Sequence, residues 1–125
     1  DIIDTQSIKL YNIVVARTDL RKKEAVKREI NVKSKLLESW DHKVYYPPVY
    51  KMYTEVIIDN DSKRILGAQI IGNKNSEIAK RIDIFAAAIF NKMKTDDFNQ
   101  LDLSYTPPLS SPWDPVQMAV QEIEK

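Results

Sequence analysis

The sequence is poor in the residues that most often carry chemistry in proteins. Its 125 residues include no cysteine, two glycines and one histidine. Without cysteine, the chain cannot supply a thiolate nucleophile, a disulfide or a cysteine-based zinc site. The two glycines, Gly67 and Gly72, form no Gly-x-Gly-x-x-Gly motif or other phosphate-binding loop, so a Rossmann-type dinucleotide site within this chain is excluded. We therefore expect the chain to bind no cofactor alone and not to be an enzyme by itself.

The single histidine, His42, is not expected to bind a metal. A metal site without cysteine would need carboxylates at ligand spacing, and only Asp41 and Glu38 lie near His42 in the sequence. An exposed or hydrogen-bonded histidine is the simpler interpretation, so no metal site is predicted.

Long apolar segments are also missing. Charged residues make up 30% of the chain, and no run is long enough for a transmembrane helix. No basic and then apolar segment opens the sequence, so we expect no secretory signal, no membrane partner and a cytoplasmic location. The 43% of hydrophobic residues suffice for one core. We predict a single domain, 1–125, with 1–6 as a linker or ragged start.

Charge is unevenly distributed along the chain. The formal net charge is +1, yet eight lysines and arginines stand against three acidic residues between positions 17 and 35. A solvated helix face is the simplest interpretation of this cluster. No aromatic or glycine-rich binding motif accompanies it, so no nucleic-acid partner is expected. The alternative is a stand-alone α+β interaction module that uses the basic surface to bind an acidic partner.

The hydrophobic pattern predicts a mixture of strands and helices. Strands are predicted over 7–18, 32–39, 50–59 and 65–71, and a helix over 19–30 capped by Thr18. The turn residues 60–62 join the last two strands into a hairpin. Glycine within a strand marks a bulge or a close approach, which applies to Gly67 and Gly72.

Helices dominate the second half of the sequence. Apolar residues at helical spacing predict a long helix over 76–93, capped by Ser76, and a short helix follows at 95–101. Asp114, Pro115 and Gln117 form a helix-start signal with a capping box. Because strands and helices do not alternate strictly, we predict an α+β fold in which an antiparallel β-sheet has helices packed on one face.

Two segments combine aromatic residues with proline. They are residues 45–48 (YYPP) and 105–108 (YTPP). Proline fixes its own φ and restricts the preceding residue, so a side chain can be held there without helix or sheet. A phenol donates a hydrogen bond at neutral pH. These tyrosines therefore suit contact with a ligand or a partner subunit, or they are ordinary loop residues that pack over the edge of the core.

Residues 102–115 (DLSYTPPLSSPWDP), followed by Met118 and Ala119, resemble the carboxy-terminal signature of one enzyme family. This is the coenzyme A disulfide reductase, NADH oxidase and NADH peroxidase branch of the pyridine nucleotide-disulfide oxidoreductases. The segments 66–72 (LGAQIIG) and 80–83 (KRID) agree with it in order and spacing. The resemblance implies the dimerisation domain of a homodimeric flavoprotein whose other domains bind FAD and NAD(P)H.

The resemblance also implies which residues reach the partner subunit's site. Tyr105 and one of Tyr45 and Tyr46 match tyrosines that lie beside a cysteine of the partner's FAD domain, where coenzyme A forms a mixed disulfide. The loop residues implied to lie near the partner's FAD are Pro107, Pro108 and Ser110.

The chain leaves the electron acceptor of the parent enzyme open. Classical members of the family carry a His-Pro pair and a downstream Glu where this chain has Tyr105-Thr-Pro-Pro. A coenzyme A disulfide reductase is therefore the favoured parent, and an NADH oxidase or NADH peroxidase is the alternative. Coenzyme A disulfide, oxygen, peroxide and polysulfide remain possible acceptors, and NADH and NADPH are not distinguished.

Overall fold

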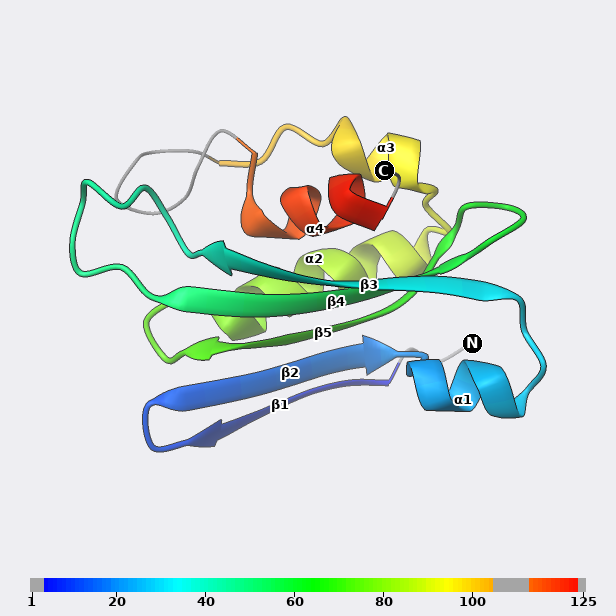
Figure 1. The fold of residues 1–125 in the computed structure, drawn as a ribbon, viewed down its shortest axis with the longest axis horizontal. Coiled ribbons are helices and arrows are strands. Elements are labelled where there is room, and N and C mark those ends of the chain that lie inside the picture. Colours follow the sequence, from blue (N-terminus) through cyan, green and yellow to red (C-terminus); the bar gives the residue numbers. More distant parts are fainter. Residues whose placement is uncertain (1–3, 105–112, 124–125) are drawn as a thin grey trace.

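The computed structural model describes residues 4–104 and 113–123, which form a sheet with helices on both of its faces. The sheet has five antiparallel strands in the order β1-β2-β5-β4-β3 (Figure 1). The strands are β1 (Thr5–Leu10), β2 (Ile13–Asp19), β3 (Val32–Trp40), β4 (Lys51–Asp59) and β5 (Ile65–Asn73). The helices are α1 (Lys22–Lys27), α2 (Ile78–Phe90), α3 (Thr95–Asn99) and α4 (Pro115–Ile123).

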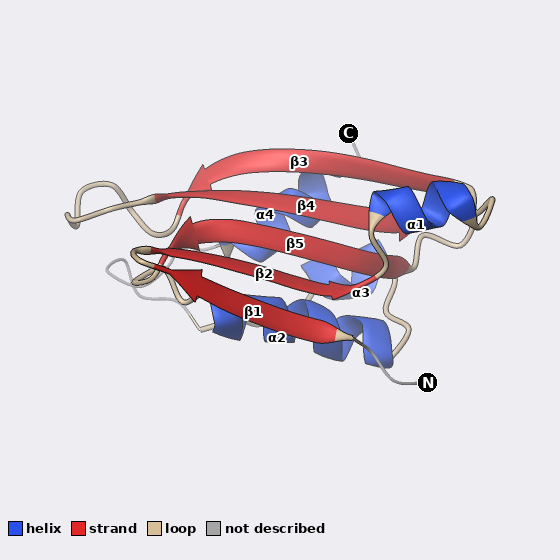
Figure 2. Ribbon diagram, turned by 90° about the horizontal axis from the view of Figure 1, so that it is seen from below, coloured by secondary structure: helices blue, strands red, loops and turns tan. Residues whose placement is uncertain are grey.

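Three of the helices cover one face of the sheet and enclose the main core. Figures 1 and 2 show α2, α3 and α4 together on this face. The rings of Phe85 on α2 and Phe98 on α3 are buried and stack with centroids 5.0 Å apart. Alternate residues of the central strands, among them Val56 and Ile70, complete the core. The predicted α+β fold with an antiparallel sheet is confirmed, and three of the four described helices pack on one face as predicted.

The short helix α1 is the exception, because it lies on the opposite face near one end of the sheet (Figure 2). Three buried apolar residues, Leu20, Ala25 and Ile57, lie outside the main core. Ile57 alternates with Val56 and Ile58 of the main core, so its side chain points to the face that α1 covers. The rest of that face is not covered by any described helix.

The predicted strand 7–18 is two strands that form a hairpin. β1 and β2 pair in register, with Ile8 opposite Val15, and the chain reverses at Tyr11, where φ is 57°. The turn contains neither glycine nor proline, so the apolar residues on its two sides form one uninterrupted segment that predicts a single strand. Thr5 and Gln6, expected to belong to a linker, pair with β2 and are part of this hairpin.

The predicted helix 19–30 is too long at both ends. α1 covers Lys22–Lys27, and Asp19 is the last residue of β2 with φ at 54°. Thr18 does not cap the helix because its hydroxyl lies 2.8 Å from the hydroxyl of Thr5 across the hairpin. The basic cluster 17–35 is therefore spread over β2, α1 and β3 rather than over one helix face. Within it, the Arg21 guanidinium donates to Glu24 at 2.8 Å and lowers the pKa of that carboxyl.

The other boundaries agree with the sequence to within three residues, and α2 ends at Phe90 where the prediction ran to Met93. Strands β3, β4 and β5 and the helix start at Asp114 lie where they are predicted. The Asp114 side chain accepts from Val116 N at 3.0 Å, and Asp114 N donates to Gln117 Oε1 at 3.3 Å, which confirms the capping box. Ser76 is not a cap, because α2 begins at Ile78 and the Ser76 hydroxyl binds elsewhere. None of the described helices is long and apolar enough to cross a membrane.

Candidate functional site

The candidate tyrosines Tyr45 and Tyr46 lie on the segment 41–50, which connects β3 and β4 at one end of the sheet (Figure 1). Their side chains are 65% and 43% exposed, and their ring centroids are 4.9 Å apart. Because no described element covers them, both phenols are accessible to another molecule or domain.

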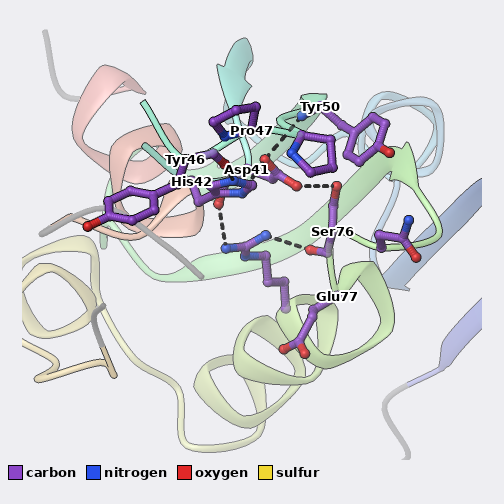
Figure 3. A pocket seen from close by; sticks show the side chains of 10 residues that line it. Asp41, His42, Tyr46, Pro47, Tyr50, Ser76 and Glu77 are labelled. Carbon is purple, nitrogen blue, oxygen red and sulfur yellow. Dashed lines mark hydrogen bonds and ion pairs between the residues drawn. The ribbon is translucent and has the colours of Figure 1, made fainter. Parts of the chain in front are cut away.

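A buried carboxylate closes the base of this segment. Asp41 is 3% exposed, and its two carboxylate oxygens have different donors. The Ser76 hydroxyl donates to Oδ2 at 2.8 Å, and Tyr50 N donates to Oδ1 at 3.2 Å. Asp41 N in turn donates to the Tyr50 carbonyl at 2.9 Å. These bonds join the two ends of segment 41–50 and tie them to the residues before α2 (Figure 3).

His42 links the buried carboxylate to the tyrosines. Its Nδ1 lies 2.8 Å from Asp41 Oδ1, and its Nε2 lies 2.6 Å from the Tyr46 carbonyl oxygen. Both partner atoms are hydrogen-bond acceptors. Of the two alternatives predicted for His42, an exposed or a hydrogen-bonded side chain, the structure shows the hydrogen-bonded one. Within the described part of the chain, no three His, Cys, Asp or Glu side chains gather where they could hold a metal ion.

The buried guanidinium of Arg81 joins the same network from α2. The residue is 6% exposed. Nη1 donates to the Ser76 carbonyl at 2.5 Å, and Nη2 donates to the Asp41 carbonyl at 2.9 Å (Figure 3). Nε lies 3.4 Å from Asp114 Oδ1 at the start of α4. Arg81 therefore connects segment 41–50, α2 and α4.

Two cavities flank segment 41–50. One, of about 350 Å³, lies between the segment and the start of α2, and Asp41, His42, Tyr50 and Arg81 line it (Figure 3). The polar groups that line it form hydrogen bonds with one another, and these bonds hold segment 41–50 in place. The other, of about 490 Å³, is lined from one side by residues 38–40 and 42–44 and from the other by Trp113 and Met118.

A charged pair lies at the rim of the larger cavity. Lys51 Nζ lies 2.6 Å from Glu38 Oε1 and 5.4 Å from the ring centroid of Trp40. The hydrogen bond with Glu38 raises the pKa of the lysine. The lysine is therefore a cation at neutral pH, and it lies within cation–π distance of the Trp40 ring.

Segment 41–50 and the first described residue after 105–112, Trp113, lie in the same region. Tyr45 and Tyr46 belong to the segment 41–50, whose residues Lys43 and Val44 share a cavity with Trp113. Trp113 is the residue that follows the loop 105–112 in the sequence. The predicted site residues Tyr105, Pro107, Pro108 and Ser110 themselves lie outside the described residues.

Sequence reasoning missed the network of Arg81 and Asp41. A signal for Arg81 was available, because it falls on the buried stripe of α2 three residues after Ile78 and one before Ile82. A cation at such a position must have buried partners. Asp41 has no comparable signal, since it lies in an irregular segment.

Residues 5–115 match the family described as the pyridine nucleotide-disulphide oxidoreductase dimerisation domain. The NAD(P)H sulfur oxidoreductase (CoA-dependent) of Pyrococcus furiosus is 32% identical over 92% of this chain and 25% of its own length. The coenzyme A disulfide reductase of Staphylococcus aureus is 28% identical over 71% of this chain and 22% of its own length. The chain thus spans about a quarter of the length of these curated relatives.

Solved structures agree with these sequence matches. The NAD-dependent persulfide reductase of A. fulgidus superposes with a TM-score of 0.91 at 30% identity and covers 97% of this chain and 22% of its own. Reduced CoADR-RHD of Bacillus anthracis gives 0.90 at 32% identity, with 96% and 21% covered. The water-forming NADH oxidase of Lactobacillus brevis also gives 0.90, but at 18% identity it supports the fold alone. By sequence and by structure, this chain belongs to the dimerisation-domain family of the pyridine nucleotide-disulphide oxidoreductases.

Proposed function

We propose that this chain is the dimerisation domain of a homodimeric, FAD-dependent NAD(P)H oxidoreductase that reduces coenzyme A disulfide or a related persulfide or polysulfide. The proposal on substrate follows the relatives that are 30% and 32% identical, which are named as persulfide and CoA-dependent sulfur reductases. An NADH oxidase or NADH peroxidase remains the second candidate, because residues 102–115 resemble a signature that these enzymes share with the coenzyme A disulfide reductases.

The observation that carries the dimerisation role is an exposed apolar surface, the open face of the sheet. It is the face opposite α2, α3 and α4. The register aligns Ile8, Val15, Ile71 and Tyr53 in one row across β1, β2, β5 and β4. Ile8 is 58% exposed, and Ile71 and Tyr53 are about 40% exposed. A contiguous apolar surface of this kind marks an interaction site.

The occupant that we propose for the open face is a second copy of the same domain. In the next row, Arg17 on β2 and Glu55 on β4 lie on either side of Gln69 on β5. If two sheets pack face to face about a two-fold axis along β5, each β2 faces the partner's β4. Arg17 then lies opposite the partner's Glu55, which is the self-complementary pattern that a two-fold interface requires. The apolar stripe of α2 is not available for this contact, because Ile82 and Phe85 are buried in the domain's own core.

The exposed tyrosines would serve the partner subunit's active site. In the parent enzyme, FAD and NAD(P)H would supply the electrons, and a cysteine of the partner's FAD domain would hold coenzyme A as a mixed disulfide. We propose that Tyr105 and one of Tyr45 and Tyr46 donate a hydrogen bond to the thiolate that leaves when this disulfide is cleaved. The loop residues proposed to lie near the partner's flavin are Pro107, Pro108 and Ser110.

Sedimentation of the full-length parent tests the dimerisation role. Ile71→Lys places a charge at the centre of the open face, and Lys74→Ala, an exposed change just after β5, is the control. We expect Ile71→Lys to sediment as a folded monomer at concentrations where the wild type and the control are dimers. If Ile71→Lys remains a dimer, the open face covers another domain of the same chain and this part of the proposal is wrong.

A further inference from the structure

The network around Arg81 has the geometry of an anchor for segment 41–50, which carries Tyr45 and Tyr46. Two of the guanidinium's partners are backbone carbonyls, Ser76 O at 2.5 Å and Asp41 O at 2.9 Å. These carbonyls are 35 residues apart in the sequence, so Arg81 joins two segments that no strand pairing connects. A bond to a backbone carbonyl does not depend on the side-chain rotamer of the accepting residue, so it fixes the backbone of Asp41 in segment 41–50 itself.

Arginine is suited to this role in a way that lysine is not. Its planar fork directs several N–H groups at once, whereas a lysine ammonium is a compact point charge on a flexible chain. Here the fork reaches Ser76 through Nη1, Asp41 through Nη2 and Asp114 through Nε. A lysine at position 81 would keep the charge but could not hold all three positions at once.

The anchor extends from Asp41 to the tyrosines through His42. The Asp41 carboxylate is held by the Ser76 hydroxyl at 2.8 Å and lies 2.8 Å from His42 Nδ1. His42 Nε2 then lies 2.6 Å from the carbonyl of Tyr46. A continuous series of short polar contacts therefore runs from the buried side of α2 to the backbone that presents the two phenols (Figure 3).

We propose that Arg81 is a positioning residue, which sets the placement of the Tyr45 and Tyr46 phenols by anchoring segment 41–50 to α2 and α4. Its effect on turnover rests on the proposed function of the tyrosines, whereas its effect on segment 41–50 does not. The role needs no contact between Arg81 and a substrate. A small displacement of a donor from its working geometry is enough to slow a reaction by about 10- to 100-fold.

Two measurements on the full-length parent test the proposal. The first is hydrogen–deuterium exchange of Arg81→Lys, with Lys80→Arg on the exposed side of the same helix as the matched control. We expect faster exchange of the amides in segment 41–50, including Tyr46 N and Tyr50 N, and no change within β4 and β5. The control is expected to match the wild type. Unchanged exchange in segment 41–50 of a folded Arg81→Lys protein overturns the proposal.

The second measurement is a double-mutant cycle of Arg81→Lys and Tyr46→Phe, with Tyr45→Phe in parallel. If Arg81 acts through a tyrosine, kcat falls by about 10-fold or more with little change in KM, and the double variant is no slower than the slower single variant. If the losses in kcat of the two single variants multiply in the double variant, in both cycles, then Arg81 does not act through either tyrosine and its role is only structural. If neither tyrosine variant changes turnover, the proposed function of Tyr45 and Tyr46 fails, and the exchange result alone decides the anchoring role.

A second variant covers the case in which Arg81→Lys does not fold. His42→Gln removes the last link of the same chain of contacts and leaves the Arg81 guanidinium and the core in place. We expect it to speed exchange at Tyr46 N and leave exchange at the start of α2 unchanged. Wild-type exchange throughout segment 41–50 in His42→Gln would overturn the proposed anchor.

Discussion

The backbone of Gly67 on β5 lies directly against the carbonyl group of Leu20. A Cβ atom at position 67 would lie 1.8 Å from the Leu20 oxygen and 2.8 Å from its carbonyl carbon. Leu20 N also donates to the Leu66 carbonyl at 3.2 Å. The chain between β2 and α1 therefore crosses the sheet in contact with the backbone, and only glycine leaves room for it.

We expect Gly67→Ala to lower the free energy of unfolding by about 2–3 kcal/mol, because the methyl group meets a backbone atom that cannot rotate away. Gly72→Ala is the matched control. Its Cβ would lie 2.7 Å from the Cδ1 of Ile78, which is the end of a flexible side chain. Denaturant unfolding of both variants makes the comparison, and equal losses at the two positions would show that Leu20 can move aside.

The carboxylate of Asp59 organises the turn between β4 and β5. Oδ1 accepts from Asp61 N at 2.8 Å and from Ser62 N at 3.1 Å. These backbone hydrogen bonds lower the pKa of Asp59 below its ordinary value of 3.8. Because the pKa is lower in the folded state, the ionised carboxylate stabilises the fold above that value. This contribution is lost as the pH falls through the lowered folded-state pKa.

We therefore expect Asp59→Asn to be less stable than the wild type at pH 7 and to approach it in stability in acid below pH 3.8. Thermal unfolding measured across this range gives the difference at each pH. Asp61→Asn, an exposed change in the same turn, is the control, because Asp61 contributes its backbone N–H and not its side chain to the hydrogen bond with Asp59. A gap between Asp59→Asn and the wild type that stays constant with pH would contradict the expected linkage.

The stacked pair Phe85 and Phe98 joins α2 and α3 within the core. Phe98 is fully buried, so Phe98→Ala removes a whole ring from the contact. We expect the free energy of unfolding to fall by about 3–5 kcal/mol, because the lost burial is accompanied by a cavity. Phe90→Ala at the end of α2 is the control. Its ring is 70% exposed, and the expected change in unfolding free energy is within about 0.5 kcal/mol.

In the full-length parent, Tyr45→Phe and Tyr46→Phe test which phenol serves the site. Each change removes a hydroxyl and keeps the ring, so the fold and the flavin content are expected to stay as in the wild type. We expect kcat for disulfide reduction to fall by about 10- to 100-fold for one of the two, the one that donates to the thiolate. Steady-state turnover and the flavin absorbance of each variant provide the check. Wild-type turnover in both would leave Tyr105 as the only candidate donor.

The sequence-based predictions succeeded where the signal for an element lay within the element itself. The strands β4 and β5 and the helices α2 and α4 carry strong periodicity, and their ends carry turn or capping residues such as Asp59 and Asp114. The hairpin of β1 and β2 was missed because it turns at Tyr11 with a positive φ and without glycine. Ser76 was misread as a cap because its hydroxyl finds a buried acceptor, Asp41, that is remote in the sequence. A distant partner thus overrides a local preference.

The sequence by itself determined what this chain cannot do and which family it belongs to. The lack of cysteine and of a glycine-rich loop excludes a thiolate and a Rossmann-type site, since both depend on residue types alone. Only the tertiary structure decided how segment 41–50 is held. Asp41, Ser76, Arg81 and Asp114 are dispersed over the chain, and their hydrogen bonds exist only once the sheet and helices place them together. The tertiary structure also decides the open face of the sheet, because a row such as Ile8, Val15 and Ile71 forms only through the register of separate strands.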